Sequence, residues 1–122
     1  MTTGCSLRNG HPVNPNGPLS LDEVTTASIN ARAILGGQSE FVRGQSMLPI
    51  FGSRTLLLHR EAWPVQVGQL IVINYNGSKY FHQVIAVNGN RFQTKGINNQ
   101  KPDPWLDKRH YVGTVYWAGW FG

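Results

Sequence analysis

Short runs of alternating apolar and polar residues follow one another from about residue 40 to the end of the chain. The runs at 40–43, 55–60, 69–75, 79–87, 91–96 and 111–118 are rich in β-branched and aromatic residues and are bounded by turn residues, which predicts strands. Asn-Gly pairs at 76–77 and 88–89 are strong signals for tight hairpins, so residues 83–96 are expected to form one. Many short strands with tight turns predict a mainly β fold, a small antiparallel β-rich domain.

A different pattern precedes the strands. Ser20 is a suitable N-cap for a helix of about 14 residues, with Asp22 and Glu23 in its first turn and Gly36 and Gly37 after its end. The apolar residues with roughly helical spacing are Leu21, Val24, Ile29, Ala33 and Ile34. We therefore expect one short N-terminal helix.

The chain is organised as an arm and one domain. Residues 1–19 are rich in Gly, Pro and Asn and are expected to form an irregular N-terminal arm. Residues 20–122 contain no repeat and no linker, and 122 residues in total suit a single domain with a modest core.

The net charge of +5 suits an anionic partner, but no run of Lys or Arg indicates a nucleic-acid site, so we expect no nucleic acid partner. Cys5 is the only cysteine and cannot form an internal disulfide. No apolar stretch reaches the roughly 18 residues of a membrane span, and no signal peptide is evident, so a soluble cytoplasmic protein is expected. No Cys, His and Asp cluster has metal-ligand spacing, so no metal or cofactor is expected.

Apolar residues in three places leave a peripheral membrane contact open. They are the segment 47–51 ("MLPIF"), Trp63 and the tail 116–121 ("YWAGWF"). The tail could instead pack against the domain's own core. A partner that supplies a membrane anchor is a further alternative.

The segment 41–51 ("FVRGQSMLPIF") places Ser46 where a strand is not expected to continue. Gly44 and Pro49 are residue types depleted from strand interiors, so the pattern predicts a turn. A serine on a turn can leave the sheet and meet both a base and a substrate carbonyl, and Gly44 permits close backbone approach. The alternative is a serine in an ordinary loop.

A histidine and an aspartate could complete a catalytic group. In a strand at 79–87, Tyr80, His82 and Val84 share one side, and Lys79 and Phe81 take the other. An imidazole is a suitable general base near neutral pH, although a structural core histidine is the alternative reading. Asp103, held between Pro102 and Pro104, could orient the imidazole or simply cap a turn.

Three motifs in this order resemble those of the type I signal peptidase superfamily, β-fold serine peptidases that include the self-cleaving domain of SOS-response repressors. Residues 46–49 ("SMLP") match its Ser-Met-x-Pro box, and residues 82–85 ("HQVI") resemble the His-Arg-Val box of the archaeal and endoplasmic-reticulum branch. Residues 95–103 ("KGINNQKPD") resemble a Lys-Gly-Asp-Asn-Asn box followed by aspartates. The strands "VGQLIVI" and "YVGTVYW" also fit, so the resemblance covers about residues 40–117.

The resemblance implies a soluble serine endopeptidase that cleaves a protein or peptide substrate through an acyl-enzyme. Ser46 would be the nucleophile, His82 the general base and Asp103 the third catalytic residue. Residues 44–47, that is Gly44, Gln45, Ser46 and Met47, would bind the oxyanion and the substrate. Relatives bind the substrate as an added strand and prefer small side chains near the scissile bond. Lys79, three residues from His82, would face away from the site.

Some positions depart from the family pattern. Ile97 replaces the first acid of the third box, Gln69 replaces another common Asp, and Gly44 stands where many relatives have a serine hydroxyl that helps bind the oxyanion. Two alternatives therefore stay open: a degenerate peptidase fold that serves as a peptide-binding or assembly module, and a self-cleaving repressor-like domain. The chain shows no convincing DNA-binding helix-turn-helix ahead of the domain.

Overall fold

The computed structural model describes residues 6–8, 11–13, 19–42 and 54–121. In chain order, the elements are β1 (Ser6–Arg8), β2 (His11–Val13), α1 (Leu21–Leu35), β3 (Gln38–Phe41), β4 (Thr55–Arg60), β5 (Leu70–Tyr75), β6 (Ser78–Asn88), β7 (Arg91–Lys95), β8 (Leu106–Asp107), the 3₁₀ turn η1 (Lys108–His110) and β9 (Tyr111–Trp120). The predicted mainly β fold with one N-terminal α-helix is confirmed.

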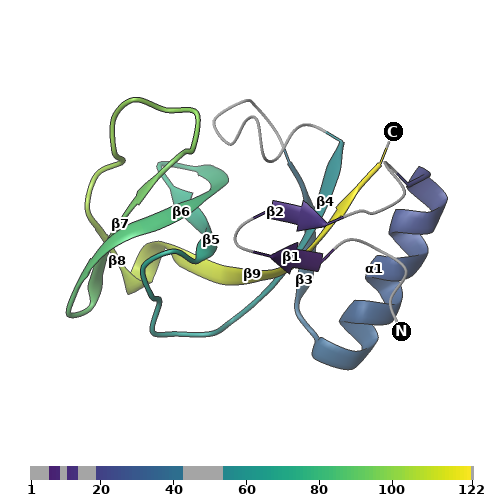
Figure 1. The fold of residues 1–122 in the computed structure, drawn as a ribbon. Helices are drawn as coiled ribbons and strands as arrows, with labels where there is room; N and C mark the ends of the chain where they lie inside the picture. Colours follow the sequence, from purple (N-terminus) through teal and green to yellow (C-terminus); the bar gives the residue numbers. More distant parts are fainter. Residues whose placement is uncertain (1–5, 9–10, 14–18, 43–53, 122) are drawn as a thin grey trace.

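Seven strands form one antiparallel sheet in the order β3-β4-β9-β5-β6-β7-β8. β9 joins the two halves of this sheet, because its C-terminal part pairs with β4 and its N-terminal part pairs with β5. Figure 1 shows β9 running between α1 at one end of the molecule and the curled β6–β8 part at the other.

The tight turns fall at the predicted places. Asn76 and Gly77 connect β5 to β6, and both have positive φ, at 51° and 75°. That combination defines the turn type whose twist matches a two-residue hairpin. The predicted hairpin of residues 83–96 is also present, as β6 and β7 pair from Gln83 with Lys95 to Asn88 with Arg91.

Helix α1 begins at the predicted N-cap. Ser20 and Glu23 form a reciprocal capping box, with both bonds at 3.1 Å. The buried face consists of Val24, Ala27, Ser28 and Ala31, whereas the larger residues Leu21, Ile29 and Ile34 are exposed. Small residues let the helix approach the sheet closely. In the described part of the chain, no helix has the length and apolar character needed to cross a membrane.

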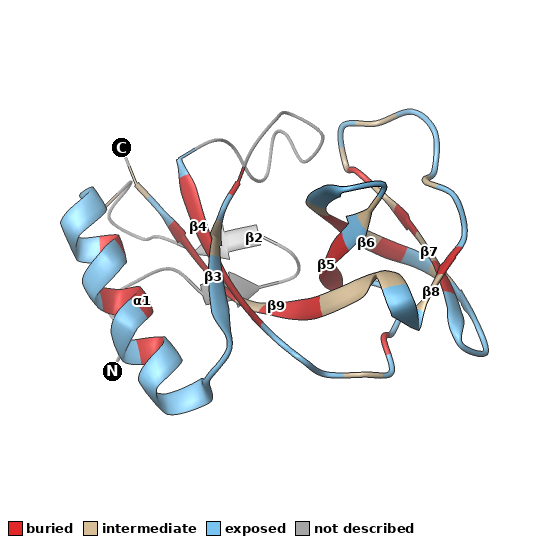
Figure 2. Ribbon diagram, turned by 180° about the vertical axis from the view of Figure 1, so that it is seen from behind, coloured by how far each residue is buried: buried red, intermediate tan, exposed pale blue. Residues whose placement is uncertain are grey.

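Alternate residues of the central strands pack into different core clusters. Leu57 and Val72 belong to a cluster with Phe81, whereas Leu58 packs with α1 and Ile71 packs with Phe92. Figure 2 shows this as buried segments along the inner strands and along the side of α1 that faces them. The period-2 pattern of the sequence thus specifies both faces of the sheet.

The N-terminal arm contains more structure than the predicted irregular segment. β1 and β2 form a two-stranded antiparallel sheet with Ser6 opposite Val13 and Arg8 opposite His11. β1 also lies against β9. The composition of the arm concealed these strands, yet the sequence places Asn9 and Gly10 between them, the same pair that marks the β5–β6 turn.

Candidate active site

His82 lies in the middle of β6, opposite Ile71 of β5, and only 6% of its surface is exposed. The alternation of β6 places it on the side of Tyr80, whose ring centroid is 4.8 Å away at a tilt of 53°. Val84 and Tyr80 pack in one core cluster and Phe81 in another, as the predicted strand geometry requires. The imidazole is therefore held by a rigid strand and a neighbouring ring.

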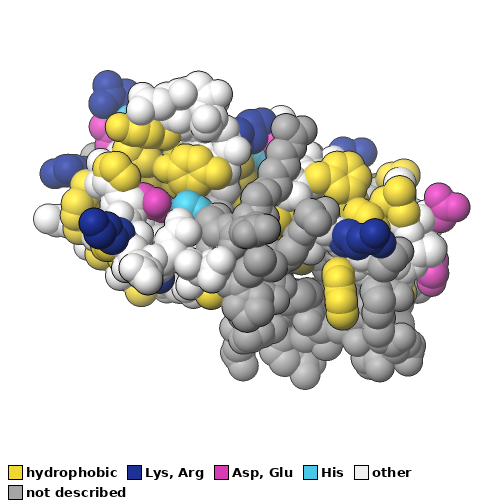
Figure 3. All heavy atoms as spheres, turned by 90° about the horizontal axis from the view of Figure 1, so that it is seen from above, with side chains coloured by type: hydrophobic (Ala, Val, Ile, Leu, Met, Phe, Trp, Pro, Cys, Tyr) yellow, Lys and Arg dark blue, Asp and Glu magenta, His cyan; other side chains and the backbone are white. Residues whose placement is uncertain are grey.

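Asp103 is the polar partner of this imidazole. Its Oδ2 lies 2.5 Å from His82 Nδ1, and the exposed fractions of the two side chains are only 16% and 8%. Because an ionised carboxylate can only accept, Nδ1 must carry the proton that is shared. In the neutral ring, Nε2 is then the nitrogen without a proton, which makes it a hydrogen-bond acceptor. Seen from above, a histidine and an acidic side chain adjoin hydrophobic side chains on this side of the molecule (Figure 3).

Strand β7 holds Asp103 through three hydrogen bonds. The Thr94 hydroxyl donates to Asp103 Oδ2 at 2.7 Å, and the backbone N–H of Asp103 donates to the Thr94 carbonyl at 2.8 Å. The Gln93 side chain donates to the Asp103 carbonyl at 3.0 Å. A turn leads to this segment, with Asn99 N–H bonded to the Gly96 carbonyl at 3.0 Å.

Tyr80 adds a neutral aromatic wall to the pair. Burial, with further contributions from the charges of Asp103 and Tyr75, raises the pKa of Tyr80 to about 12. Its phenol therefore stays protonated near neutral pH and is no competing base. The ring instead presents a π face to an imidazole that would become positive when it accepts a proton.

The predicted nucleophile, Ser46, and its neighbours Gly44, Gln45 and Met47 lie outside the described residues. The segment that contains them joins β3 to β4, which are antiparallel neighbours. Its first anchor, Val42, bonds Thr55 through the backbone at 2.9 Å and packs in the core cluster that contains Phe81, the residue before His82. Val42 is four residues from Ser46, which allows a reach of at most about 14 Å.

Two lysines near His82 have other partners. Lys79 Nζ bonds Glu40 Oε1 at 2.9 Å, across from β6 to β3. Lys95 Nζ bonds the Gly96 carbonyl at 3.2 Å. Lys79 thus faces the opposite side of β6 from the His82–Asp103 pair, as the strand periodicity predicted.

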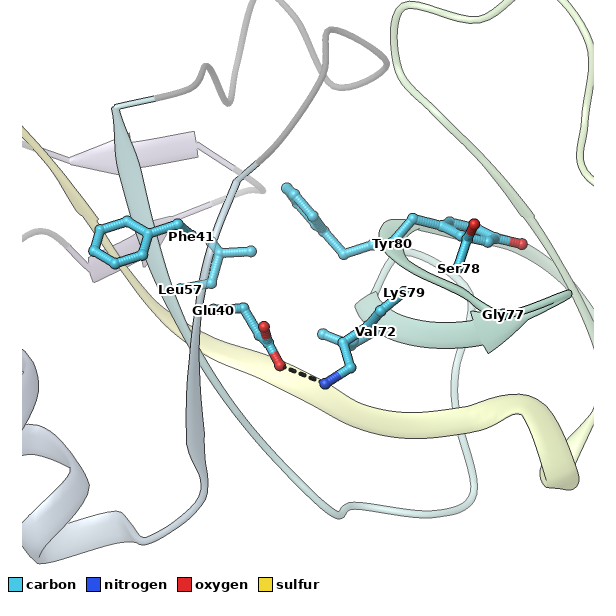
Figure 4. A pocket seen from close by; sticks show the side chains of 9 residues that line it. Glu40, Phe41, Leu57, Val72, Gly77, Ser78, Lys79 and Tyr80 are labelled. Atoms are coloured by element: carbon cyan, nitrogen blue, oxygen red, sulfur yellow. Dashed lines mark hydrogen bonds and ion pairs between the residues drawn. The ribbon is translucent and has the colours of Figure 1, made fainter.

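A groove of about 490 Å³ lies on that opposite side, between β3 and β6. Its floor includes Leu57, Val72 and Phe81, and the Glu40–Lys79 ion pair spans it (Figure 4). Phe81, which lines the groove, directly precedes His82 on β6, and the two side chains point to opposite faces of the strand. An extended chain lying there could place a side chain against this apolar floor.

Two described positions that differ from the signal-peptidase motifs have structural roles. Ile97 packs against the core cluster that includes Val42 and Phe81, so an apolar contact stands where those motifs have an acid. Gln69 organises a turn, because its Oε1 accepts from Gln66 N–H at 2.9 Å and its backbone pairs with both Gln66 and Val84.

His59 is a second buried histidine, and it neighbours Glu40, the partner of Lys79. It is 2% exposed, and its Nε2 lies 3.5 Å from Glu40 Oε1 without a hydrogen-bond partner among the described residues. Burial lowers the pKa of His59, and the nearby Glu40 offsets only part of this. Burial also opposes ionisation of Glu40, but the hydrogen bond and positive charge of Lys79, with a smaller contribution from the neighbouring His59, outweigh it and lower the pKa of Glu40.

This environment predicts acid sensitivity. Between its lowered folded pKa and the ordinary value of 6.5, His59 binds more protons in the unfolded state than in the folded state. The free energy of unfolding should therefore fall as the pH is lowered from about 7 towards 5. Denaturant titrations at several pH values should show this slope in the native chain and a shallower slope in His59→Gln. Equal slopes in the native chain and in His59→Gln would contradict the assignment of this acid sensitivity to His59.

Sequence reasoning identified His82 and Asp103 but overlooked Thr94 and Gln93, which hold Asp103 in place. Threonine is common in strands, so the sequence around residue 94 gives no indication that this side chain has a special role. The predicted pairing of β6 with β7, together with the turn at 96–99, would have placed Asp103 close to β7. In the described residues, no group of three or more His, Cys, Asp or Glu side chains could hold a metal ion.

The comparisons with known proteins assign no family to the chain. No protein-family model matches the chain, and no curated protein matches it.

Proposed function

We propose that the chain is a serine endopeptidase of the signal-peptidase type, with Ser46 as nucleophile, His82 as general base and Asp103 as the residue that orients the base. The single observation that carries the proposal is the buried 2.5 Å contact between His82 Nδ1 and Asp103 Oδ2. It leaves Nε2 of the neutral ring able to accept a proton, which is the state a general base requires.

In the proposed reaction, Ser46 Oγ attacks the carbonyl carbon of the scissile peptide bond while His82 Nε2 takes the hydroxyl proton. The carbonyl electrons move to the oxygen, and the Ser46 backbone N–H stabilises that oxyanion. The C–N bond then breaks, and the leaving amine receives the proton from Nε2. Water attacks the acyl-enzyme by the same proton route and releases the second product.

The groove between β3 and β6 supports a peptide substrate rather than a small molecule. It is open along two strands, and its apolar floor of Leu57, Val72 and Phe81 suits one side chain of an extended chain. Exposed strand edges bind extended peptides through backbone hydrogen bonds, with neighbouring pockets selecting side chains. β3 is the edge strand of the sheet on this side.

The test is to treat the purified chain with a fluorophosphonate probe and to locate the adduct by mass spectrometry of its peptides. One adduct, on Ser46, is expected. Ser78 is an exposed serine that lines the groove, so Ser78→Ala is the matched control and should react as the native chain does. A chain that takes up no probe at any pH, but binds peptides, would instead be a binding module.

A further inference from the structure

Thr94 makes an unusual contact for a buried threonine in a strand. It is the penultimate residue of β7, is 1% exposed and is opposite Val84 of β6. Its hydroxyl donates at 2.7 Å to Asp103 Oδ2, the same oxygen that lies 2.5 Å from His82 Nδ1. One carboxylate oxygen therefore receives two donors, one from each of two paired strands.

We propose that Thr94 is a positioning residue for the His82–Asp103 pair, acting through Asp103 without touching a reacting atom. This inference deepens the proposed function and rests on it for its kinetic consequences. Pro102 and Pro104 restrict the backbone around Asp103 but leave the carboxylate free to rotate about its last side-chain bond. A hydroxyl from a rigid strand removes this freedom and selects Oδ2 as the acceptor for the imidazole.

The geometry of Thr94 suits this task. A β-branched side chain has few χ1 positions, so its hydroxyl is fixed once the strand is fixed. The backbone bond from Asp103 N–H to the Thr94 carbonyl, at 2.8 Å, sets the spacing between the same two residues. Thr94 thus holds Asp103 at both its backbone and its side chain.

The hydroxyl also affects the tautomer of the imidazole. Because Thr94 holds Oδ2 towards His82 Nδ1, this oxygen accepts the Nδ1–H, and Nε2 is then the nitrogen that accepts the Ser46 proton. Loss of the hydroxyl should therefore let the carboxylate turn and allow part of the neutral ring to carry its proton on Nε2.

Three variants test this inference. Thr94→Val removes the O–H and keeps the shape, whereas Thr94→Ser keeps the O–H. Thr114→Val is the matched control, because Thr114 is also a buried threonine of the same sheet and its hydroxyl bonds Tyr111 at 2.7 Å rather than Asp103. Thr94→Ala replaces Thr94→Val if the latter does not fold, as judged by thermal melting.

Two readouts are needed: the rate of fluorophosphonate labelling, and the nitrogen chemical shifts of the neutral His82 ring, which report its tautomer. Thr94→Val should slow labelling about tenfold, as for loss of a hydrogen bond to a charged group, and should raise the share of Nε2–H tautomer. Thr94→Ser and Thr114→Val should stay close to the native chain in both readouts.

The two readouts separate the possible failures. If the native chain is not labelled, the proposed function fails, while the tautomer measurement still decides whether Thr94 positions the pair. A native tautomer and labelling rate in Thr94→Val would overturn the inference. A loss in Thr94→Ser equal to that in Thr94→Val would also overturn it, because side-chain shape and not the hydroxyl would then matter.

Discussion

Replacing His82 with alanine is expected to slow acylation of Ser46 by about 10²–10⁴-fold, the usual contribution of a positioned general base. The variant retains the nucleophile and the groove but has no group to accept the hydroxyl proton. The measurement is the second-order rate of fluorophosphonate labelling, compared at one pH, with circular dichroism to establish that the sheet is intact.

Lys79→Ala and Lys95→Ala are the controls for this prediction, because a lysine near the site is the alternative candidate for the base. Lys79 bonds Glu40 across the groove and Lys95 bonds the Gly96 carbonyl, so neither is expected to receive the Ser46 proton. Both variants should retain most of the labelling. Labelling that persists in His82→Ala but disappears in either lysine variant would contradict the assignment of the base.

The same variant also distinguishes an enzyme from a peptide-binding module. His82 and the groove floor lie on opposite faces of β6, so His82→Ala should leave peptide affinity nearly unchanged while it removes catalysis. A chain whose only function is binding would show no labelling in either form and no difference between them. Binding alone is therefore an insufficient readout, and rate and affinity must be measured together.

The strands could be predicted because two local signals agree in the sequence. Leu56, Leu57 and Leu58 alternate between two core clusters, and the pairs Asn76-Gly77 and Asn88-Gly89 mark the connections on either side of β6. Alternation fixes which residues share a face, and a two-residue turn fixes the register. Together they place His82 on the face of Tyr80 before any tertiary information is used.

The helix face could not be predicted in the same way. The apolar pattern gives a helical spacing but not the buried side, because Ile29 and Ile34 are exposed whereas Ala27 and Ala31 are buried. The helix crosses β4 and β9, where Trp117 already fills the space beside Val24. The size of the partner side chain decides which helical residues fit, and that information lies about 90 residues away in the sequence.

The candidate site shows the same division between local and distant information. The order of three short motifs indicated which histidine and aspartate to expect together, and the described geometry joins them. The role of Thr94 depends on the pairing of β6 with β7 and on the path of the chain from Gly96 back to Asp103. No property of residue 94 alone distinguishes it from Thr55, which is equally buried.

Asp103→Asn should also have a large effect, a loss of about 10³–10⁴-fold in the labelling rate, as expected when a catalytic histidine loses its orienting carboxylate. The amide can occupy the same place in two ways. With its nitrogen towards His82 Nδ1, it requires the ring to accept there and to carry its proton on Nε2, where it cannot take the Ser46 proton. With its oxygen towards Nδ1, the tautomer is kept, but the negative charge that would stabilise the imidazolium is lost.

Asp107→Asn is the matched control for this last substitution. Asp107 belongs to the same part of the chain, but its carboxylate bonds Arg109 through the backbone N–H at 3.0 Å and the side chain at 3.1 Å, not His82. The Asp107→Asn variant should react with the probe at the native rate. The tautomer of the His82 ring in Asp103→Asn, read from its nitrogen shifts, decides between the two amide orientations. If Asp103→Asn labels as fast as Asp107→Asn, catalysis requires only Ser46 and His82, and Asp103 is a structural partner of the imidazole.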